Sequence, residues 1–166
     1  CGDGDNGAYG WQALTELARE LPVDVRFIEM MPIGYGKQFE TVDHKRLLAQ
    51  MYEVYPDLKP DKRSHGFGPA VYYHVPGFQG SLGLISAIHG KFCGTCNRVR
   101  LTSTGYLKTC LCYEDGVDLR PLLRTAAEDE ALLMVMERAI YGKPSAHCFE
   151  EPEKITEAHN MSSIGG

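Results

Sequence analysis

Three cysteines within one short segment have the residue type and the spacing of a metal site. Cys93, Cys96 and Cys110 follow the pattern C-x2-C-x13-C, and the first two enclose a turn that contains Gly94. Thiolates bind zinc ions or iron–sulfur clusters, and a C-x2-C pair brings two sulfurs onto one tight turn. No secretion signal is recognisable, so we expect a cytoplasmic, reducing compartment, where clustered cysteines are metal ligands more often than disulfides.

The number of protein ligands separates two kinds of metal site. A closed zinc site needs a fourth ligand, for which Cys112 is the natural candidate and His89 is another. The chain would then be a non-catalytic structural zinc-binding module. An iron–sulfur cluster can be held by three cysteines, which leaves one iron open to a substrate. The spacing leaves both interpretations open and slightly favours zinc.

Two arginines next to the cysteines indicate the charge of a ligand. Arg98 and Arg100 follow Cys96 at alternate positions. If residues 98–102 form a strand, both side chains point to the same face. Two guanidinium groups on one face can bind a phosphate or the edge of a base through paired hydrogen bonds. The segment therefore predicts a metal site beside a site for a negatively charged substrate.

The first part of the chain predicts helices and a buried strand. Apolar residues at helical spacing predict helices near 8–21 and over 43–55. The β-branched and apolar run 23–31 predicts a strand buried on both faces, as in a parallel sheet. In β/α folds of this kind, the loops at the carboxyl ends of the strands carry the site.

The second part predicts antiparallel β-structure that carries the cysteines on its edges. A loop rich in charge, proline and glycine over 56–69 separates the two parts, and we place the boundary between residues 58 and 59. Strand-like runs and a hairpin with a Ser-Thr-Gly turn follow, over 70–75, 81–88 and 99–110.

Composition limits the partners that the chain can have. The formal net charge of -5 argues against a general nucleic-acid binder, which would show a basic balance or face. No apolar run approaches the roughly 20 residues that span a bilayer. We therefore expect neither nucleic acid nor membrane as a partner. Since the first residue is Cys1 and not methionine, we interpret the chain as a piece of a longer protein.

Four segments carry a resemblance to a known family. The sequence FCGTCNRVRLTSTGYLKTCL (92–111) resembles the C-terminal cluster segment of the MoaA family, and the similarity extends to VRFIEMMPIG (25–34), GKPSAHCF (142–149) and MSSIGG (161–166). Members of this family are radical S-adenosylmethionine enzymes, the GTP 3',8-cyclases of molybdenum cofactor biosynthesis. They convert GTP to (8S)-3',8-cyclo-7,8-dihydroguanosine 5'-triphosphate, so the resemblance implies a lyase.

The resemblance also implies a role for each of the three cysteines. Cys93, Cys96 and Cys110 match the ligands of the family's second [4Fe-4S] cluster, whose fourth iron has no protein ligand and contacts the guanine of GTP. Under this interpretation Cys112 is not a ligand. The cysteines would hold and orient the substrate, and the radical would be generated elsewhere.

Further positions match the substrate-binding and cofactor-binding residues of the family. Arg98, Val99 and Arg100 match the stretch that binds GTP beside the second cluster. Met31 matches a position that contacts S-adenosylmethionine. Catalytic roles are implied for three residues, namely Arg26, which lines the active site, and Gly165 and Gly166 of the tail that reaches into it.

One part of the family pattern is missing from this sequence. The C-x3-C-x2-C motif of the other cluster, which reduces S-adenosylmethionine, does not occur here. The resemblance therefore implies an α/β fold in which residues 1–58 end an incomplete (β/α) radical-SAM barrel of the TIM type. Residues 59–166 would form an α+β cluster-binding and GTP-binding domain with antiparallel strands. Alone, the chain would be inactive, and its missing partner would be the N-terminal half of the enzyme. An exposed strand edge favours association, for instance as a homodimer.

Overall fold

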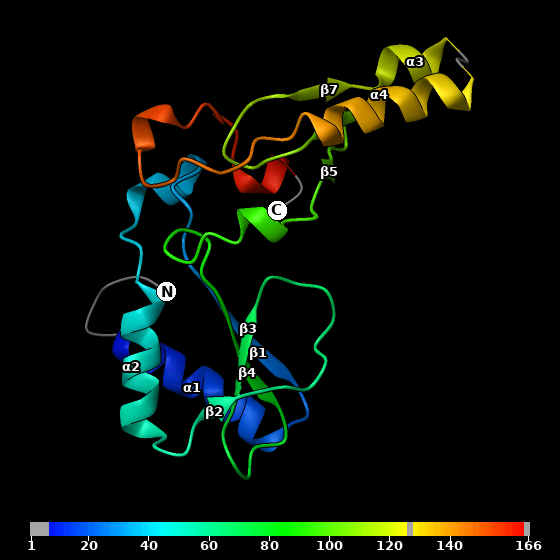
Figure 1. Cartoon of the computed structure of the whole chain (residues 1–166). Helices are drawn as coiled ribbons and strands as arrows, with labels where there is room; N and C mark the ends of the chain where they lie inside the picture. The colour runs from blue at the N-terminus through cyan, green and yellow to red at the C-terminus, as the bar shows by residue number, and fades with distance from the viewer. Residues whose placement is uncertain (1–6, 126–127, 165–166) are drawn as a thin grey trace. The chain divides into compact units, whose positions relative to one another are not determined.

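The computed structural model describes residues 7–125 and 128–164. The chain divides into two compact units that alternate along the sequence. Unit 1 spans Cys1–Met31 and Phe39–Phe92, and unit 2 spans Pro32–Gln38 and Cys93–Gly166. The ribbon of each unit is shown in Figure 1. Within the described ranges, no helix is long and apolar enough to cross a membrane.

Unit 1 contains a four-stranded mixed sheet and two helices (Figure 1). The strands lie in the order β1-β4-β3-β2. Strand β1 is parallel to β4, whereas the other pairs are antiparallel. The bounds are α1 Gly7–Glu20, β1 Asp24–Ile28, α2 His44–Val54, β2 Lys59–Pro60, β3 Val71–His74 and β4 Ser81–Ile85. Both predicted helices and the predicted strand after the first helix are confirmed.

One face of the sheet and both helices share the core of unit 1. The core residues are Trp11, Ala18, Phe27, Leu47, Met51, Tyr55, Leu58, Val75, Phe78, Leu82 and Leu84. On β1, Phe27 points into this core, and its neighbour Ile28 is 56% exposed. The prediction of a strand buried on both faces is therefore wrong for this chain. Side chains alternate along a strand, and the helices cover only one side of β1.

The sheet of unit 1 crosses the position where we expected a boundary. Strand β2 begins at Lys59 and pairs with β3, which pairs with β4 and through it with β1. The residues immediately after 58 therefore extend the same sheet as β1. The chain leaves this unit for the second time after Phe92, just before the first cysteine of the C-x2-C pair.

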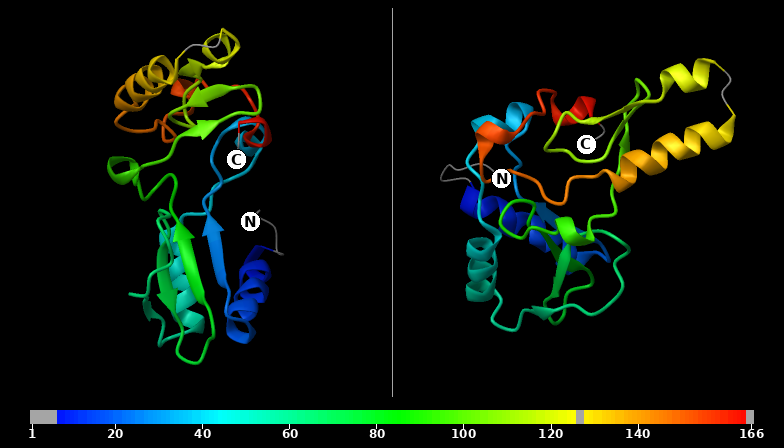
Figure 2. Two further views of the ribbon diagram at one scale, coloured as in Figure 1. Left: turned by 90° about the vertical axis from the view of Figure 1, so that its right-hand side faces the viewer. Right: turned by 45° about the horizontal axis from the view of Figure 1, so that its top comes forward.

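Unit 2 contains an antiparallel sheet in the order β5-β6-β7 and two helices. The bounds are β5 Arg100–Leu101, β6 Tyr106–Lys108, β7 Gly116–Asp118, α3 Arg120–Arg124 and α4 Asp129–Tyr141. The predicted hairpin is confirmed, and Gly105 closes its turn with a φ of 79° and an N–H bond to the Thr102 carbonyl at 3.0 Å. Helices α3 and α4 lie side by side (Figure 2).

The C-terminal segment of unit 2 is attached to β6 by a buried ion pair. Lys108 and Glu157 are paired, and their side chains are 4% and 0% exposed. The Lys108 ammonium also donates to the Tyr113 carbonyl at 2.9 Å, and the His159 N–H donates to Glu157 at 2.8 Å. Burial alone would raise the pKa of Glu157, but these partners together lower it. The polar tail thus has a defined anchor in the unit.

Candidate metal centre

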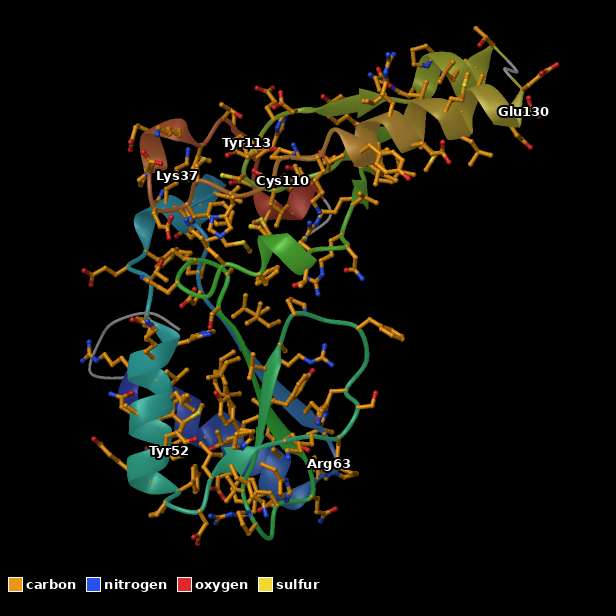
Figure 3. The ribbon with its side chains drawn as sticks, in the orientation of Figure 1. Lys37, Tyr52, Arg63, Cys110, Tyr113 and Glu130 are labelled. Atoms are coloured by element: carbon orange, nitrogen blue, oxygen red, sulfur yellow. The ribbon has the colours of Figure 1, made fainter. Side chains whose placement is uncertain are left out.

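Two structural elements position the three cysteines. Cys93 begins a 3-10 turn, Cys93–Thr95, and the Cys96 N–H donates to the Cys93 carbonyl at 3.1 Å. Cys110 lies two residues after β6, and its side chain is shown in Figure 3 near the loop that carries Tyr113. All three are reduced thiols of intermediate burial. The predicted turn between the first two sulfurs is therefore confirmed.

Hydrogen-bond donors contact the sulfurs of the C-x2-C pair. The Lys143 ammonium donates to Cys96 Sγ at 3.3 Å, and the His147 N–H donates to Cys93 Sγ at 3.4 Å. Burial alone would raise the pKa of Cys96, but the Arg98 N–H and Lys143 together lower it. Burial raises the pKa of the Cys110 thiol. These contacts favour the thiolate of Cys96, which is the form that binds metals.

The three thiols do not form a closely gathered group of metal ligands in the structure. Tetrahedral zinc with Zn–S bonds of about 2.3 Å would hold its sulfurs about 3.8 Å apart. Possible ligand atoms of His, Cys, Asp and Glu that lie within 4.8 Å of one another could hold a metal ion. Among the described residues, Glu29, Asp43 and His89 meet this criterion. Cys93, Cys96 and Cys110 are not such a group in this structure. Three thiols, two of which accept N–H bonds from the same segment, are a donor set that an iron–sulfur cluster can use.

Both candidates for a fourth zinc ligand have other partners. Cys112 Sγ lies 2.9 Å from Cys148 Sγ and accepts the Cys148 N–H at 3.2 Å, and both side chains are buried. Burial, together with the hydrogen bond to Cys148, raises the pKa of Cys112 to about 12. His89 belongs to unit 1, where its Nδ1 lies 3.1 Å from a Glu29 oxygen. These contacts give no support to a four-ligand zinc site.

The two arginines lie close enough to Cys96 and Cys110 to affect one another's charge. Arg98 precedes β5, which begins only at Arg100, so the expected strand over 98–102 is shorter than predicted. Arg100 is half-buried, and burial together with the charge of Arg98 lowers its pKa. The Cys96 and Cys110 thiolates act in the opposite direction. The arginines therefore place positive charge beside the thiols of Cys96 and Cys110.

The other residues with predicted roles lie in both units: Arg26 and Met31 in unit 1 and Val99 in unit 2. Arg26 lies on β1, with its guanidinium carbon 5.8 Å from the centroid of the Tyr72 ring, and Val99 is 39% exposed. A Cβ on Gly83, opposite Arg26, would lie 2.9 Å from Tyr72 Cε1, so a larger residue there would displace the ring. Met31 is half-exposed at the end of the first stretch of unit 1. Gly165 and Gly166 lie outside the described residues.

Comparison with known families decides the relationship. Residues 23–149 match the family described as Molybdenum Cofactor Synthesis C. The chain belongs to this family. This confirms the expected relationship to the enzymes of molybdenum cofactor synthesis.

Similar proteins in bacteria carry the name GTP 3',8-cyclase. The chain is 40% identical to the protein of Clostridium perfringens (strain 13 / Type A) over 153 residues, which are 92% of this chain and 47% of the relative. It is 39% identical to the protein of Heliobacterium modesticaldum over 157 residues, again 92% of the chain and 47% of the relative. For Hydrogenovibrio crunogenus the identity is 38% over 159 residues, with 93% and 48% covered. The chain thus spans about half the length of the curated relatives it matches.

Two polar residues, Lys143 and Glu29, make contacts that the sequence did not predict. Lys143 contacts the cysteine turn, as described above. Glu29 is the buried residue that directly follows β1. Its carboxylate accepts N–H bonds from Ile88 at 2.6 Å, His89 at 3.0 Å and His44 at 3.3 Å. Burial alone would raise the pKa of Glu29, but these bonds together lower it. The sequence signal for Glu29 was an acidic residue inside the apolar run 23–31. No sequence signal pointed to Lys143, because it is 47 residues away from its partner Cys96.

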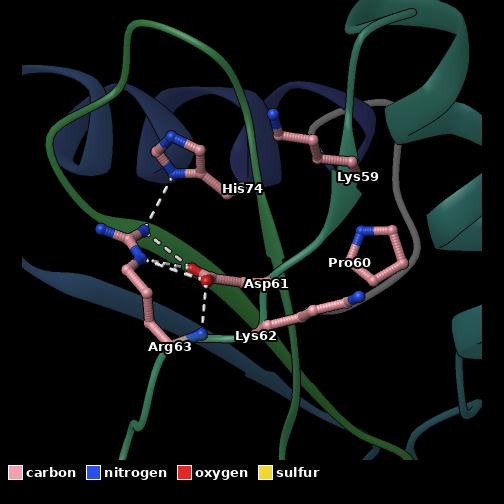
Figure 4. A pocket seen from close by; sticks show the side chains of 6 residues that line it. All are labelled: Lys59, Pro60, Asp61, Lys62, Arg63 and His74. Atoms are coloured by element: carbon pink, nitrogen blue, oxygen red, sulfur yellow. Dashed lines mark hydrogen bonds and ion pairs between the residues drawn. The ribbon is translucent and has the colours of Figure 1, made fainter.

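Unit 1 has a hollow of about 600 Å³ (Figure 4), and none of the three cysteines lines it. It is lined by Lys59, Pro60, Asp61, Lys62, Arg63 and His74. Arg63 donates to the Asp61 carboxylate at 2.7 Å, and the Ser81 hydroxyl donates to the same group at 2.6 Å. Arg63 holds the pKa of Asp61 far below its usual range. The central charges of the hollow therefore neutralise each other.

Proposed function

We propose that the chain is the C-terminal part of a GTP 3',8-cyclase and that its unit 2 binds a [4Fe-4S] cluster and GTP. Cys93, Cys96 and Cys110 are the proposed ligands. The observation that carries the proposal is the set of contacts at these cysteines. The sulfurs of Cys93 and Cys96 accept N–H bonds, and Arg98 and Arg100 place positive charge near the cysteines. The relatives that carry the cyclase name cover 92% or more of this chain.

The residues of unit 2 would bind and orient the nucleotide. When bound, the cluster would supply an iron without a protein ligand, which can accept a donor atom of a purine. Arg98 and Arg100 would hold the same molecule by charge-assisted hydrogen bonds, and Val99 would contact it between them. Holding a substrate in one orientation is itself a large contribution to catalysis. The tail residues Gly165 and Gly166 are proposed to reach the bound nucleotide.

Unit 1 is proposed to be the end of a radical-SAM barrel. Its helices α1 and α2 and the parallel pair of β1 and β4 support this assignment. Met31, which follows β1, would contact S-adenosylmethionine, and Arg26 on β1 would line the active site. The first half of the barrel, with the cluster that reduces S-adenosylmethionine, would be supplied by the N-terminal half of the enzyme. The chain alone would therefore not generate a radical.

The test is nucleotide binding by the full chain after anaerobic loading with iron and sulfide. We expect GTP to bind the loaded chain, and Arg98→Ala to weaken binding by about 2–3 kcal/mol, the contribution of a charge-assisted hydrogen bond. The affinity is measured by calorimetric titration, with Arg138→Ala as the control, because Arg138 is an exposed arginine of α4. A loaded chain that does not bind GTP, or equal affinities for wild type and Arg98→Ala, would contradict the proposal.

A further inference from the structure

One lysine side chain connects the metal-binding turn to the arginine segment. The Lys143 ammonium donates to the Cys96 carbonyl at 3.1 Å, to Cys96 Sγ at 3.3 Å and to the Arg98 carbonyl at 2.7 Å. An ammonium group has three N–H donors, and here each one has an acceptor. All three acceptors belong to the short stretch that carries a proposed cluster ligand and a proposed GTP ligand.

The end of helix α4 fixes the position of this lysine. The Gly142 N–H donates to the Arg138 carbonyl at 3.0 Å, and the Lys143 N–H donates to the Ile140 carbonyl at 3.2 Å. Pro144 follows and restricts the backbone of the residue before it. Lys143 therefore leaves the helix from a constrained position, and its contact with the cysteine turn is part of the fold of unit 2.

The same segment contacts the other sulfur of the C-x2-C pair. The His147 N–H donates to Cys93 Sγ at 3.4 Å. Residues 143–147 thus provide one hydrogen-bond donor for each sulfur of the pair, and only the donor on Cys96 carries a charge. Hydrogen bonds to ligand sulfurs tune the reduction potential of iron–sulfur clusters, and such partners orient the ligands.

We propose that Lys143 is a positioning residue that fixes the Cys96 thiolate and the Arg98 main chain together and raises the reduction potential of the bound cluster. This inference rests on the proposed function, because it needs a cluster on Cys93, Cys96 and Cys110. Reduction adds negative charge to the cluster and its thiolates. A cation at Cys96 Sγ stabilises that reduced state more than the oxidised one, so the potential is higher with Lys143 than without it.

Three variants separate the charge of Lys143 from its bulk. Lys143→Met keeps most of the length and removes both the charge and the donors. Lys143→Arg keeps the charge and the donors. Lys154→Met is the matched control, because Lys154 is an exposed lysine of the same unit that pairs with Glu151. If Lys143→Met is unfolded by far-UV circular dichroism, Lys143→Gln takes its place with the same expectation.

The experiment uses the full chain, loaded anaerobically with iron and sulfide. The potential is measured by a reductive titration followed by electron paramagnetic resonance, and cluster retention by the rate of iron release to a chelator. We expect Lys143→Met to shift the potential to more negative values and to release iron about 10-fold faster or more. Lys143→Arg and Lys154→Met should keep the wild-type potential. A purely structural role would change iron release and leave the potential where it is.

The outcomes distinguish this inference from the proposed function. If the wild type takes up the cluster and Lys143→Met has the same potential, the inference is wrong and the proposed function stands. If the wild-type chain takes up no iron and sulfide, the proposed function fails and the inference fails with it.

Discussion

The five described cysteines form two groups with different surroundings. Cys93, Cys96 and Cys110 are half-buried, and cationic side chains lie near Cys96 and Cys110. Cys112 and Cys148 are buried and contact each other. In the sequence, Cys112 follows Cys110 by two positions and is as good a ligand candidate as the others. Burial and the pairing of Cys112 with a residue 36 positions away separate the two groups, and neither is visible in the spacing of the cysteines.

We predict that Cys112 is dispensable for metal binding. Cys112→Ser should bind as much iron as the wild type after anaerobic loading, because its thiol contacts Cys148 and has a pKa raised to about 12. Cys96→Ser should lose the cluster, since it removes a ligand. The measurement is iron per chain after desalting, with Cys148→Ser as a control for damage to the buried pair. Equal iron loss in Cys112→Ser and Cys96→Ser would favour a site with four protein ligands.

The hairpin of β5 and β6 depends on an ion pair that the sequence does not reveal. Lys108 lies on β6, two residues before a proposed ligand, and pairs with Glu157 in the interior of unit 2. We predict that Lys108→Met lowers the free energy of unfolding by about 3–5 kcal/mol, because the buried Glu157 charge loses its partner. Urea denaturation followed by circular dichroism measures the change. The double variant Lys108→Met/Glu157→Gln should regain part of the loss, and a single variant as stable as the wild type would refute this role.

The end of β1 provides a prediction that depends on pH. The pKa of Glu29 is lowered by N–H bonds from three backbone positions. A carboxyl whose folded-state pKa lies below its unfolded value of about 4.3 stabilises the fold above that pH, and the contribution is lost as the pH falls through the folded-state pKa. Glu29→Gln should therefore lower the stability by about 1–3 kcal/mol at pH 7 and by progressively less towards pH 3. A difference that does not change between these pH values would contradict the assignment.

Local patterns predicted most of the helices and strands but not their partners. Apolar spacing was enough for α1 and α2, and a Ser-Thr-Gly turn was enough for the hairpin of β5 and β6. The parallel pairing of β1 with β4 joins residues 57 positions apart, such as Val25 and Leu82, and follows from packing against a shared core. The cysteines and arginines of the site lie close together in the sequence, so their spacing could predict them. Lys143 and Glu29 were missed because their partners are distant in sequence.

The chain as a whole corresponds to about half of the cyclases it resembles. Of the residues with proposed roles, Arg26 and Met31 belong to unit 1, and the three cysteines with Arg98 and Arg100 belong to unit 2. Strand β1 has its described partner, β4, on one side. Under the proposed function, the complete reaction would need the other half of the enzyme, whereas cluster binding would need only this chain.

Metal analysis of the full chain tests the central claim most directly. The chain is loaded anaerobically with iron and sulfide in the presence of equimolar zinc, desalted, and analysed for iron, sulfide and zinc. We predict about four irons and four sulfides per chain, with the absorption of thiolate-bound iron, and their loss in Cys93→Ser, Cys96→Ser and Cys110→Ser. One zinc per chain, without sulfide and lost on Cys112→Ser, would contradict the account.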